Sequence, residues 1–255
     1  TNNAITIQGG SKSTGFVASY GNIYSNGILP GNNDYYKRNN FSFRGNTNIK
    51  DGLAWLNYGI NYIRKDVRNA MAGQGGSGSV IYQDILQYPV NLDYAEMRDY
   101  KSVYNNADNF YTPYAQNPWW ILDSNFAESQ QDRVYGNLEF GLQLIKGLQL
   151  IARGGMDVSN TSSKMYNDLW EFSDVSYTAD EGGSVEIGSY SESYSRSTQI
   201  AANFFLNADY QLPADFSIHA TGGVNINARR AIGLSGYTQG LAITGYPSFD
   251  NTNGY

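Results

Sequence analysis

The residues in this sequence best suited to contact a ligand are aromatic side chains gathered between positions 104 and 120. Flat rings stack on sugar faces and on peptide side chains, and they lose little conformational entropy when a ligand holds them. The rings therefore predict an aromatic ligand-binding loop, although the two tryptophans are also explained by an interfacial belt or by packing of the loop against its support. The set is Tyr104, Tyr111, Tyr114, Trp119 and Trp120.

A second set consists of charged residues that alternate with apolar ones. The alternation places these charges on one face of a sheet, where water or an opposite charge must surround them if the sheet lies at membrane depth. Two interpretations follow: the charges form cross-strand ion pairs that line a water-filled lumen, or some of them contact a substrate. The set is Arg44, Arg133, Glu139, Arg153 and Asp157.

Signals for catalysis, metal binding or cofactor binding are poor. The chain contains no cysteine and a single histidine, His219, which excludes thiolate sites and any site that needs two histidines. The acidic pair Asp180-Glu181 lies in a Ser- and Gly-rich stretch and is expected to be solvated. The glycine-rich run at 73–78 lacks the Lys-Ser/Thr of a phosphate-binding loop. We therefore expect a protein that is not an enzyme and has no cofactor and no metal, with His219 an ordinary polar residue.

The elements that must position these residues are β-strands, and the clearest is a hairpin over 133–159. In its first arm Val134, Leu138 and Leu142 share one face, and Arg133 and Glu139 share the other. A period of two indicates strands because successive side chains point to opposite faces. Each arm is long enough to cross a bilayer at a tilt, which takes about 9–11 residues. One face would then meet lipid and the other water.

The same alternation recurs along the chain and predicts eight strands joined by short turns and long loops in turn. Long loops are expected at about 25–34, 65–132 and 160–195, with another beginning near Arg229, and a short helix is expected within 93–100. Bacterial outer-membrane barrels have short periplasmic turns and long extracellular loops, so this asymmetry is typical of them. The strands are expected at about 4–8, 15–24, 40–49, 53–64, 133–144, 148–159, 198–212 and 216–228.

The amino-acid composition agrees with a β-sheet that has one lipid-facing and one water-facing side. Aromatic residues make up 15% of the 255 residues, with 22 Tyr and 28 Gly, and charged residues make up only 16%, which suits β structure with aromatic belts. The net charge of −6 and the lack of a basic stripe argue against nucleic-acid binding. No apolar run of about eighteen residues predicts a membrane helix. The first residues do not read as a signal peptide, so the chain is expected to be mature or a piece of a longer protein.

In their order and spacing, several segments resemble SusC/RagA-type TonB-dependent outer-membrane transporters. Residues 7–20 resemble the first barrel hairpin of that family, and the later segments that agree are Asn26-Gly27-Ile28, Tyr36-Lys37-Arg38, Asn117-Pro118-Trp119-Trp120 and residues 132–137. The resemblance covers nearly the whole chain. It implies an all-β fold, a transmembrane antiparallel up-and-down β-barrel of about 22 strands plugged by an N-terminal domain. Residues 1–255 would then be a partial barrel, about its first eight strands, without the plug.

The resemblance also implies a function in the bacterial outer membrane, which the chain would cross many times. Such barrels import glycans or peptides too large for porins, beneath a SusD-like surface lipoprotein that acts as a lid. Energy comes from the TonB complex through the plug domain. The plug is missing from this sequence, so the residues that couple to TonB are not assigned. Arg153 and Asp157 are candidates to contact the plug. The expected partners are a SusD-like lipoprotein, the TonB complex, a glycan or oligopeptide substrate and outer-membrane lipid.

Two other classes stay open at this point. About eight strands can close into a small barrel on their own, which would make the protein a self-contained adhesin or structural anchor. A soluble β enzyme or lectin with two-faced sheets is the third possibility. It requires the rows of Phe and Leu to meet one another in a dry interior.

Overall fold

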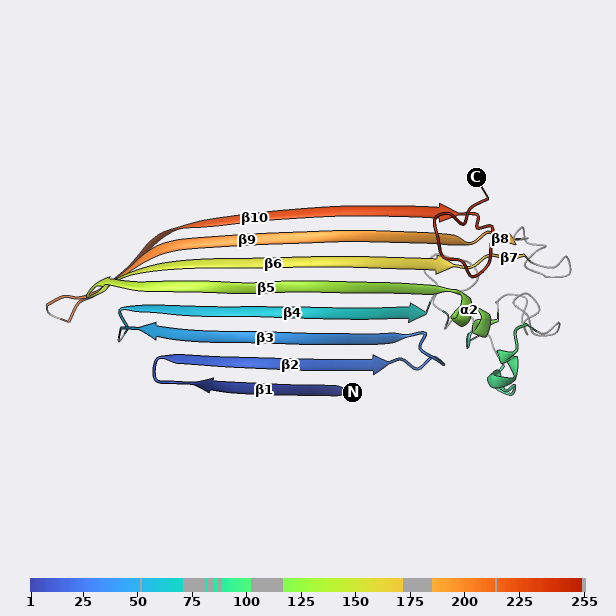
Figure 1. Ribbon diagram of the computed structural model, residues 1–255, viewed down its shortest axis with the longest axis horizontal. Helices are drawn as coiled ribbons and strands as arrows, with labels where there is room; N and C mark the ends of the chain where they lie inside the picture. Colours follow the sequence, from blue (N-terminus) through green and yellow to red (C-terminus); the bar gives the residue numbers. More distant parts are fainter. Residues whose placement is uncertain are drawn as a thin grey trace.

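The computed structural model describes residues 1–50, 52–70, 81, 85–86, 89–101, 117–171, 185–213 and 215–253. It is dominated by one antiparallel sheet of eight long strands that follow one another in chain order (Figure 1). In the described part of the chain β1 pairs only with β2 and β10 only with β9, so the sheet is open at both edges. This is the fold of part of an up-and-down β-barrel, as the sequence predicts.

All neighbouring strands of the large sheet are antiparallel. A separate two-stranded ribbon pairs β7 (Trp170–Glu171) with β8 (Val185–Glu186). The strands of the large sheet are β1 (Asn2–Gly10), β2 (Thr14–Asn26), β3 (Tyr35–Ile49), β4 (Ala54–Ala70), β5 (Phe126–Ile145), β6 (Leu148–Asn167), β9 (Ser189–Gln211) and β10 (Ser217–Gln239).

The two ends of the sheet differ. Short turns join successive strands at one end, on the left of Figure 1, and the connections that carry η1 (Tyr94–Arg98), α2 (Pro118–Ser124) and the β7–β8 ribbon lie at the other. Positive φ angles of 93° at Gly52 and 82° at Gly147 show why glycine stands in two of the turns, since other residues rarely adopt this conformation. We call the two ends the turn end and the loop end.

The strand register places apolar residues on one face across the whole sheet. Directly opposed residues share a face, and one such row crosses all eight strands: Ile7, Ala18, Phe43, Ile60, Gly136, Met156, Ile200 and Ala228. The next row toward the loop end, on the opposite face, is entirely polar: Thr6, Ser19, Ser42, Asn61, Tyr135, Asp157, Gln199 and Arg229. We call the two faces the apolar face and the polar face.

Within the described part of the chain, no second layer covers the apolar face. Ile7 is 62% exposed, Met156 48% and Ile200 54%. A soluble β-sandwich would bury such rows against a second sheet about 10 Å away. The dry interior required by the soluble alternative is therefore not seen.

The buried hydrophobic clusters lie at the loop end. One contains Leu29, Ile81, Trp120, Ile121 and Leu122. The other contains Tyr166, Tyr190 and Leu241. The core thus packs the connections against one another and against the strand ends, and the middle of the sheet contributes little to it.

The strands are longer than the sequence predicts, so the bounds expected for three loops are wrong. Strand β4 continues to Ala70 and β5 begins at Phe126, inside the loop expected at 65–132. Similarly, β6 and β9 extend into the loop expected at 160–195, and β10 passes Arg229 to end at Gln239. In the extensions of β4, β5, β6 and β9 both faces are largely polar, so the hydrophobic alternation that marks a strand disappears while the hydrogen-bond ladder continues. The extension of β10 keeps Ile232 and Leu234 on the apolar face.

The short helix expected within 93–100 is present as the 3-10 helix η1. Its N-cap is Asp93, whose carboxylate accepts a hydrogen bond from the Ala95 amide at 2.8 Å. No helix within the described ranges is long and apolar enough to span a membrane.

Candidate functional site

The polar face carries two cross-strand ion pairs formed by four of the five charged residues singled out in the sequence. Arg133 on β5 reaches diagonally to Asp157 on β6, with Nε 2.9 Å from Oδ1 and a second contact between Nη2 and Oδ2. Arg153 on β6 lies directly opposite Glu139 on β5 and donates from Nε to Oε2. Both pairs join the same two strands, so they reinforce one stretch of the sheet.

The carboxylate of Glu139 is the centre of a wider network. Its Oε1 accepts hydrogen bonds from Asn57 Nδ2 at 3.0 Å and from Trp55 Nε1 at 3.4 Å, both on β4, while Oε2 takes the bond from Arg153. The Glu139 side chain is only 17% exposed. Three donors around one carboxylate compensate for its partial burial and link β4, β5 and β6 on this face.

The two arginines are also held by aromatic rings. The guanidinium carbon of Arg133 lies 4.9 Å from the ring centre of Tyr135, and that of Arg153 lies 4.9 Å from the ring centre of Phe205. Each guanidinium is thus fixed by a carboxylate and a ring, an arrangement that suits the planar, delocalised cation. The pairs stiffen the polar face and leave limited capacity for a substrate.

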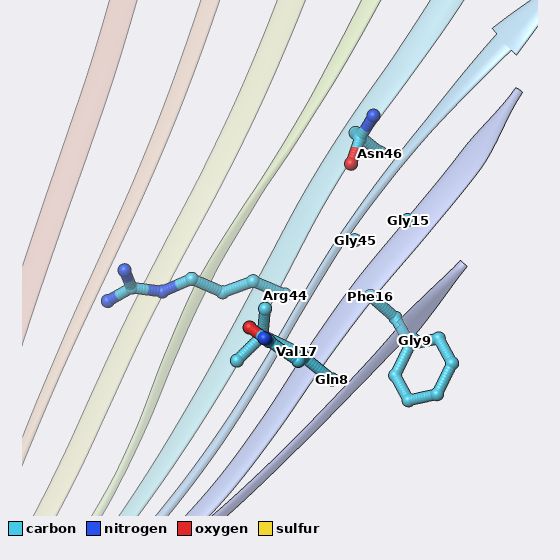
Figure 2. Close-up of a pocket in the computed structure, with 8 residues that line it drawn as sticks. All are labelled: Gln8, Gly9, Gly15, Phe16, Val17, Arg44, Gly45 and Asn46. Carbon is cyan, nitrogen blue, oxygen red and sulfur yellow. The ribbon is translucent and has the colours of Figure 1, made fainter. Parts of the chain in front are cut away.

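Arg44 differs from the other four. Within the described residues it has no ion pair or hydrogen bond, and its guanidinium extends away from Phe16 to the opposite side of the sheet (Figure 2). It lines a shallow cavity of about 430 Å³ together with Gln8, Val17 and Asn46. Arg44 is therefore the cation of the predicted set that is best placed to meet another molecule.

The aromatic residues predicted to bind a ligand fall into two groups. Tyr104, Tyr111 and Tyr114 lie outside the described residues. Trp119 and Trp120 belong to α2 at the loop end, and only 9% and 4% of their surface is exposed. The ligand-binding prediction thus stays a prediction for the three tyrosines, and the structure places the two indoles inside the packing of the loop.

The packing around Trp119 shows how this loop is built. The Asn117 side chain caps α2 by accepting from the Trp119 amide at 3.0 Å, and it donates to the Met97 carbonyl at 3.0 Å. The Trp119 ring stacks on Tyr94 with 5.3 Å between centroids, and its Nε1 donates to the Tyr94 carbonyl at 3.0 Å. These contacts tie α2 to η1.

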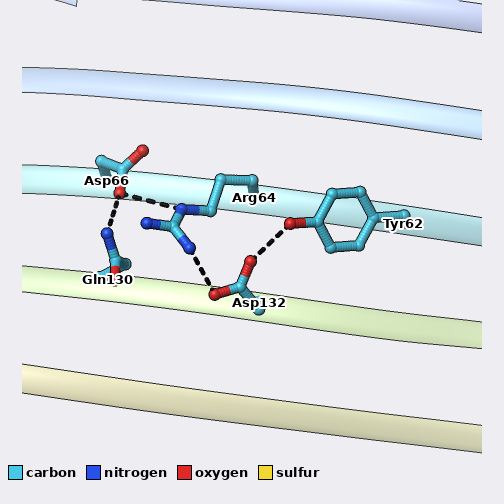
Figure 3. A network of polar contacts seen from close by, with 5 residues as sticks. All are labelled: Tyr62, Arg64, Asp66, Gln130 and Asp132. Carbon is cyan, nitrogen blue, oxygen red and sulfur yellow. Dashed lines mark hydrogen bonds and ion pairs between the residues drawn. The ribbon is translucent and has the colours of Figure 1, made fainter.

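A polar network on the apolar face escaped sequence analysis because its residues lie at the expected boundaries of a loop. Arg64 binds Asp132 with Nη1 to Oδ2 at 2.6 Å and Asp66 with Nε to Oδ1 at 3.2 Å (Figure 3). Tyr62 donates to Asp132 at 2.6 Å, and Gln130 donates to Asp66 at 2.9 Å (Figure 3). The signal that would have found it is the run of charges at alternate positions on both strands.

A second group at the loop end joins β6 to the segment that follows β10. Asp168 accepts a hydrogen bond from the Tyr166 hydroxyl at 2.6 Å and from the Gly245 amide at 3.1 Å. Burial, followed by the hydrogen bond to Asp168, raises the pKa of Tyr166 well above its ordinary value. Phe249 packs on Tyr190 with ring centres 5.1 Å apart. Residues 240–253 are thereby fixed on the strand ends.

His219 pairs with Asp209 across β9 and β10 near the turn end, and both side chains are more than half exposed. Nowhere in the described ranges do three His, Cys, Asp or Glu side chains come together as possible metal ligands. The chemistry available on the described part of the polar face is thus hydrogen bonding, ion pairing and ring contact.

The sequence matches no protein-family model and no curated protein. Solved structures do match. A chain in the structure of the RagAB peptide importer in the "open-open" state shares the fold, with a TM-score of 0.73 and 15% identity. Its "closed-closed" state gives a TM-score of 0.69 and 16% identity, and the RagAB peptide transporter gives 0.69 and 14%.

In each comparison 99% of this chain is covered but only 26% or 27% of the matched chain. The chain thus spans about a quarter of the length of the proteins that it resembles. At this identity the likeness concerns the fold, and it confirms the RagA-type barrel fold that the sequence segments predict.

Proposed function

We propose that this chain is part of the barrel wall of a TonB-dependent importer in a bacterial outer membrane. The observation that carries the proposal is the exposed apolar face, which continues across all eight strands with a polar face behind it. A lipid-facing surface backed by a water-filled lumen requires this arrangement. The open edges would be completed by further strands, since lipid cannot satisfy unpaired backbone groups.

The height of the apolar face agrees with this placement. On β6 the apolar face runs from Val158 to Leu148, ten residue steps. At a rise of about 3.3 Å per residue and a tilt of about 40°, this corresponds to about 25 Å along the membrane normal. Outer-membrane barrels have an apolar band of about this height.

On this placement the charged residues of the polar face line the lumen. The pairs Arg133–Asp157 and Arg153–Glu139 would maintain the shape of the wall, and Arg44 would face the substrate or the plug. Water and opposite charges are the surroundings that make ions tolerable at membrane depth. The mechanism is binding followed by displacement of the plug, without covalent chemistry and without a cofactor.

The loop end would meet the outside of the cell. We infer that Tyr104, Tyr111 and Tyr114 contribute to substrate contact there, while Trp119 and Trp120 support their loop from within. A SusD-like lipoprotein would cover the same end as a lid, and the TonB complex would act from the opposite side through the plug. RagAB is described as a peptide importer, so oligopeptides are a natural substrate class alongside glycans.

The test is a deletion of the gene followed by uptake and growth on a panel of glycans and oligopeptides, with an epitope-tagged protein traced in membrane fractions. We expect the protein in the outer membrane and a growth defect on one nutrient class that the intact gene restores. An outer-membrane protein whose deletion impairs adhesion and leaves uptake unchanged would favour the anchor or adhesin alternative. Recovery in the soluble fraction would reject both.

A further inference from the structure

The apolar face changes character at one level of the sheet. Its last largely apolar row toward the loop end contains Ile5, Tyr20, Phe41, Tyr62, Val134 and Val158, and it continues to Thr198 on β9 and Arg230 on β10. The next row on the same face is polar from β1 to β9: Asn3, Asn22, Asn39, Arg64, Asp132, Asn160 and Arg196. In the proposed membrane placement this step marks the outer edge of the hydrocarbon, where lipid headgroups lie.

Three of the cations just beyond this edge are neutralised by the protein itself. Arg64 is held by Asp66 and Asp132. Arg68 binds Glu128 with Nη1 to Oε1 at 3.1 Å, and Lys164 binds Glu192 at 3.1 Å. These side chains already have a carboxylate partner, so they are less available to bind another anion.

Arg196 on β9 and Arg230 on β10 are different. Both are exposed on the apolar face, and neither has an ion pair or hydrogen bond within the described residues. Arg196 opposes Ile232 and Arg230 opposes Thr198, so the two arginines are diagonal neighbours, a relation that places side chains about 7–8 Å apart. Two like charges at this spacing, with no carboxylate between them, leave a local excess of positive charge.

The surroundings of the two arginines are suited to an amphiphile. Both line a groove of about 370 Å³, in which Thr198 faces Arg230 and Ile232 faces Arg196. The groove continues toward the apolar rows over Ile200 and Ala228. Ile200 is 54% exposed and belongs to the apolar row that crosses the whole sheet. The groove therefore has cations at the headgroup level and an apolar floor on the hydrocarbon side.

We propose that Arg196 and Arg230 bind the phosphate group of an anionic outer-leaflet glycolipid, with its acyl chains lying along Ile200 and Ala228. Guanidinium groups bind phosphate oxygens in a bidentate manner, and a hydroxyl beside them adds a donor. A soluble anion would contact the arginines but not the apolar floor of the groove, whereas a lipid contacts both. This inference depends on the membrane placement proposed above and adds a specific lipid contact to it.

The experiment uses the complete protein that carries this chain, folded into phosphatidylcholine vesicles doped with diphosphorylated lipid A or with the same lipid after removal of its phosphates. Native mass spectrometry of the protein extracted into mild detergent measures the bound fraction and an apparent Kd. A surface cation contributes about 1 kcal/mol of attraction to anionic lipid, so Arg196→Gln combined with Arg230→Gln should weaken binding of the phosphorylated lipid about thirtyfold. The phosphate-free lipid should bind wild type and variant equally weakly.

The matched control removes two neighbouring cations from the polar face. Arg38 and Lys65 oppose one another on β3 and β4, and replacing both by glutamine should leave binding of lipid A unchanged. Equal affinity of wild type and the Arg196/Arg230 variant would overturn the lipid site, as would displacement of lipid A by millimolar inorganic phosphate. A protein that fails to fold into vesicles would refute the membrane placement itself, whereas a folded protein with unaltered lipid binding would refute only the lipid site.

Discussion

The assignment of faces can be tested at two adjacent positions of β5. Leu138 is 51% exposed on the apolar face, and its neighbour Asn137 points to the polar face. Leu138 pairs with Gly154 of β6, which lies four residues from Val158 and six from Leu148, close to the middle of the apolar face. The two positions share strand, depth and local backbone, so they differ mainly in the medium that surrounds their side chains.

Arginine at each position gives a quantitative expectation. Leu138→Arg places a charge near the bilayer midplane, which costs about 2–4 kcal/mol in outer-membrane barrels. Asn137→Arg places the same charge in the water-filled lumen, where we expect a cost of less than about 1 kcal/mol. Ile145→Arg, opposite Leu148 at the turn end of the apolar face, should cost about 0–1 kcal/mol because the penalty falls toward the interface.

The assay is urea unfolding of the complete protein in phosphatidylcholine vesicles, followed by tryptophan fluorescence. An equal loss of stability in the Leu138 and Asn137 variants would show that the two faces do not meet different media, and the lipid assignment would be withdrawn. Equal losses at Leu138 and Ile145 would instead contradict the depth assigned to these positions on the apolar face.

Three further predictions follow from the described contacts. In the pair Arg133–Asp157 the side chains are 42% and 34% exposed. A double-mutant cycle on the two residues should therefore give a coupling free energy of about 0.5–1 kcal/mol that decreases at high salt. A coupling that does not depend on salt would contradict the solvated lumen. The hydrogen bond from Tyr190, together with other contacts, lowers the pKa of Glu192 in the folded protein. The contribution of the ionised Glu192 to folding stability is therefore complete above about pH 4.3, the ordinary pKa of glutamate in the unfolded chain, and it is lost as the pH falls through the pKa of the folded state. The protection factors of amides at the loop end of β9, which compare the observed exchange rate with the intrinsic rate at each pH, should therefore fall on acidification, and Glu192→Gln should abolish that fall. An unchanged pH profile in the variant would assign the effect to another group. Trp120→Ala removes a buried indole and should lower the local stability of the packed loop by about 3–5 kcal/mol. Proteolysis near α2 should therefore be faster, while the protein still reaches the outer membrane. An unchanged cleavage rate would contradict the packing role of Trp120.

The strands that the sequence predicts well are those in which the two faces meet different media. Between Val134 and Leu144 every second residue is apolar or glycine, and the structure places this stretch in β5. Gly52 and Gly147 stand between successive predicted strands, and both adopt positive φ. Period and turn chemistry are local properties, which is why they can be read from the sequence alone.

The missed parts of the fold depend on contacts between distant segments. Strand β4 past Arg64 carries charges on both faces, and what keeps it extended is the pairing with β5, including Arg64–Asp132 and Arg68–Glu128. Likewise, no local pattern indicates that Gly245 donates to Asp168, 77 residues away. Such contacts exist only once the register of the sheet is fixed.

The candidate site shows the same division. Alternation assigned Arg133, Glu139, Arg153 and Asp157 to one face, but it did not identify which charges pair. The register makes Glu139 and Arg153 direct partners and leaves Arg133 and Asp157 diagonal, so both pairs form between the same two strands. Arg44 has no such neighbour among the described residues, and this difference could not be read from spacing.

The long polar extensions have a mechanical consequence in the proposed placement. On β9 the first polar row beyond the hydrocarbon contains Arg196, whereas the strand begins at Ser189. The eight residues from Ser189 to Arg196 would reach about 20 Å beyond the hydrocarbon, at a rise of about 3.3 Å per residue and a tilt of about 40°. Ion pairs such as Lys164–Glu192 brace these extensions where no lipid supports them. The loops, and any lid resting on them, would therefore be carried by a stiff rim of paired strands well above the membrane surface.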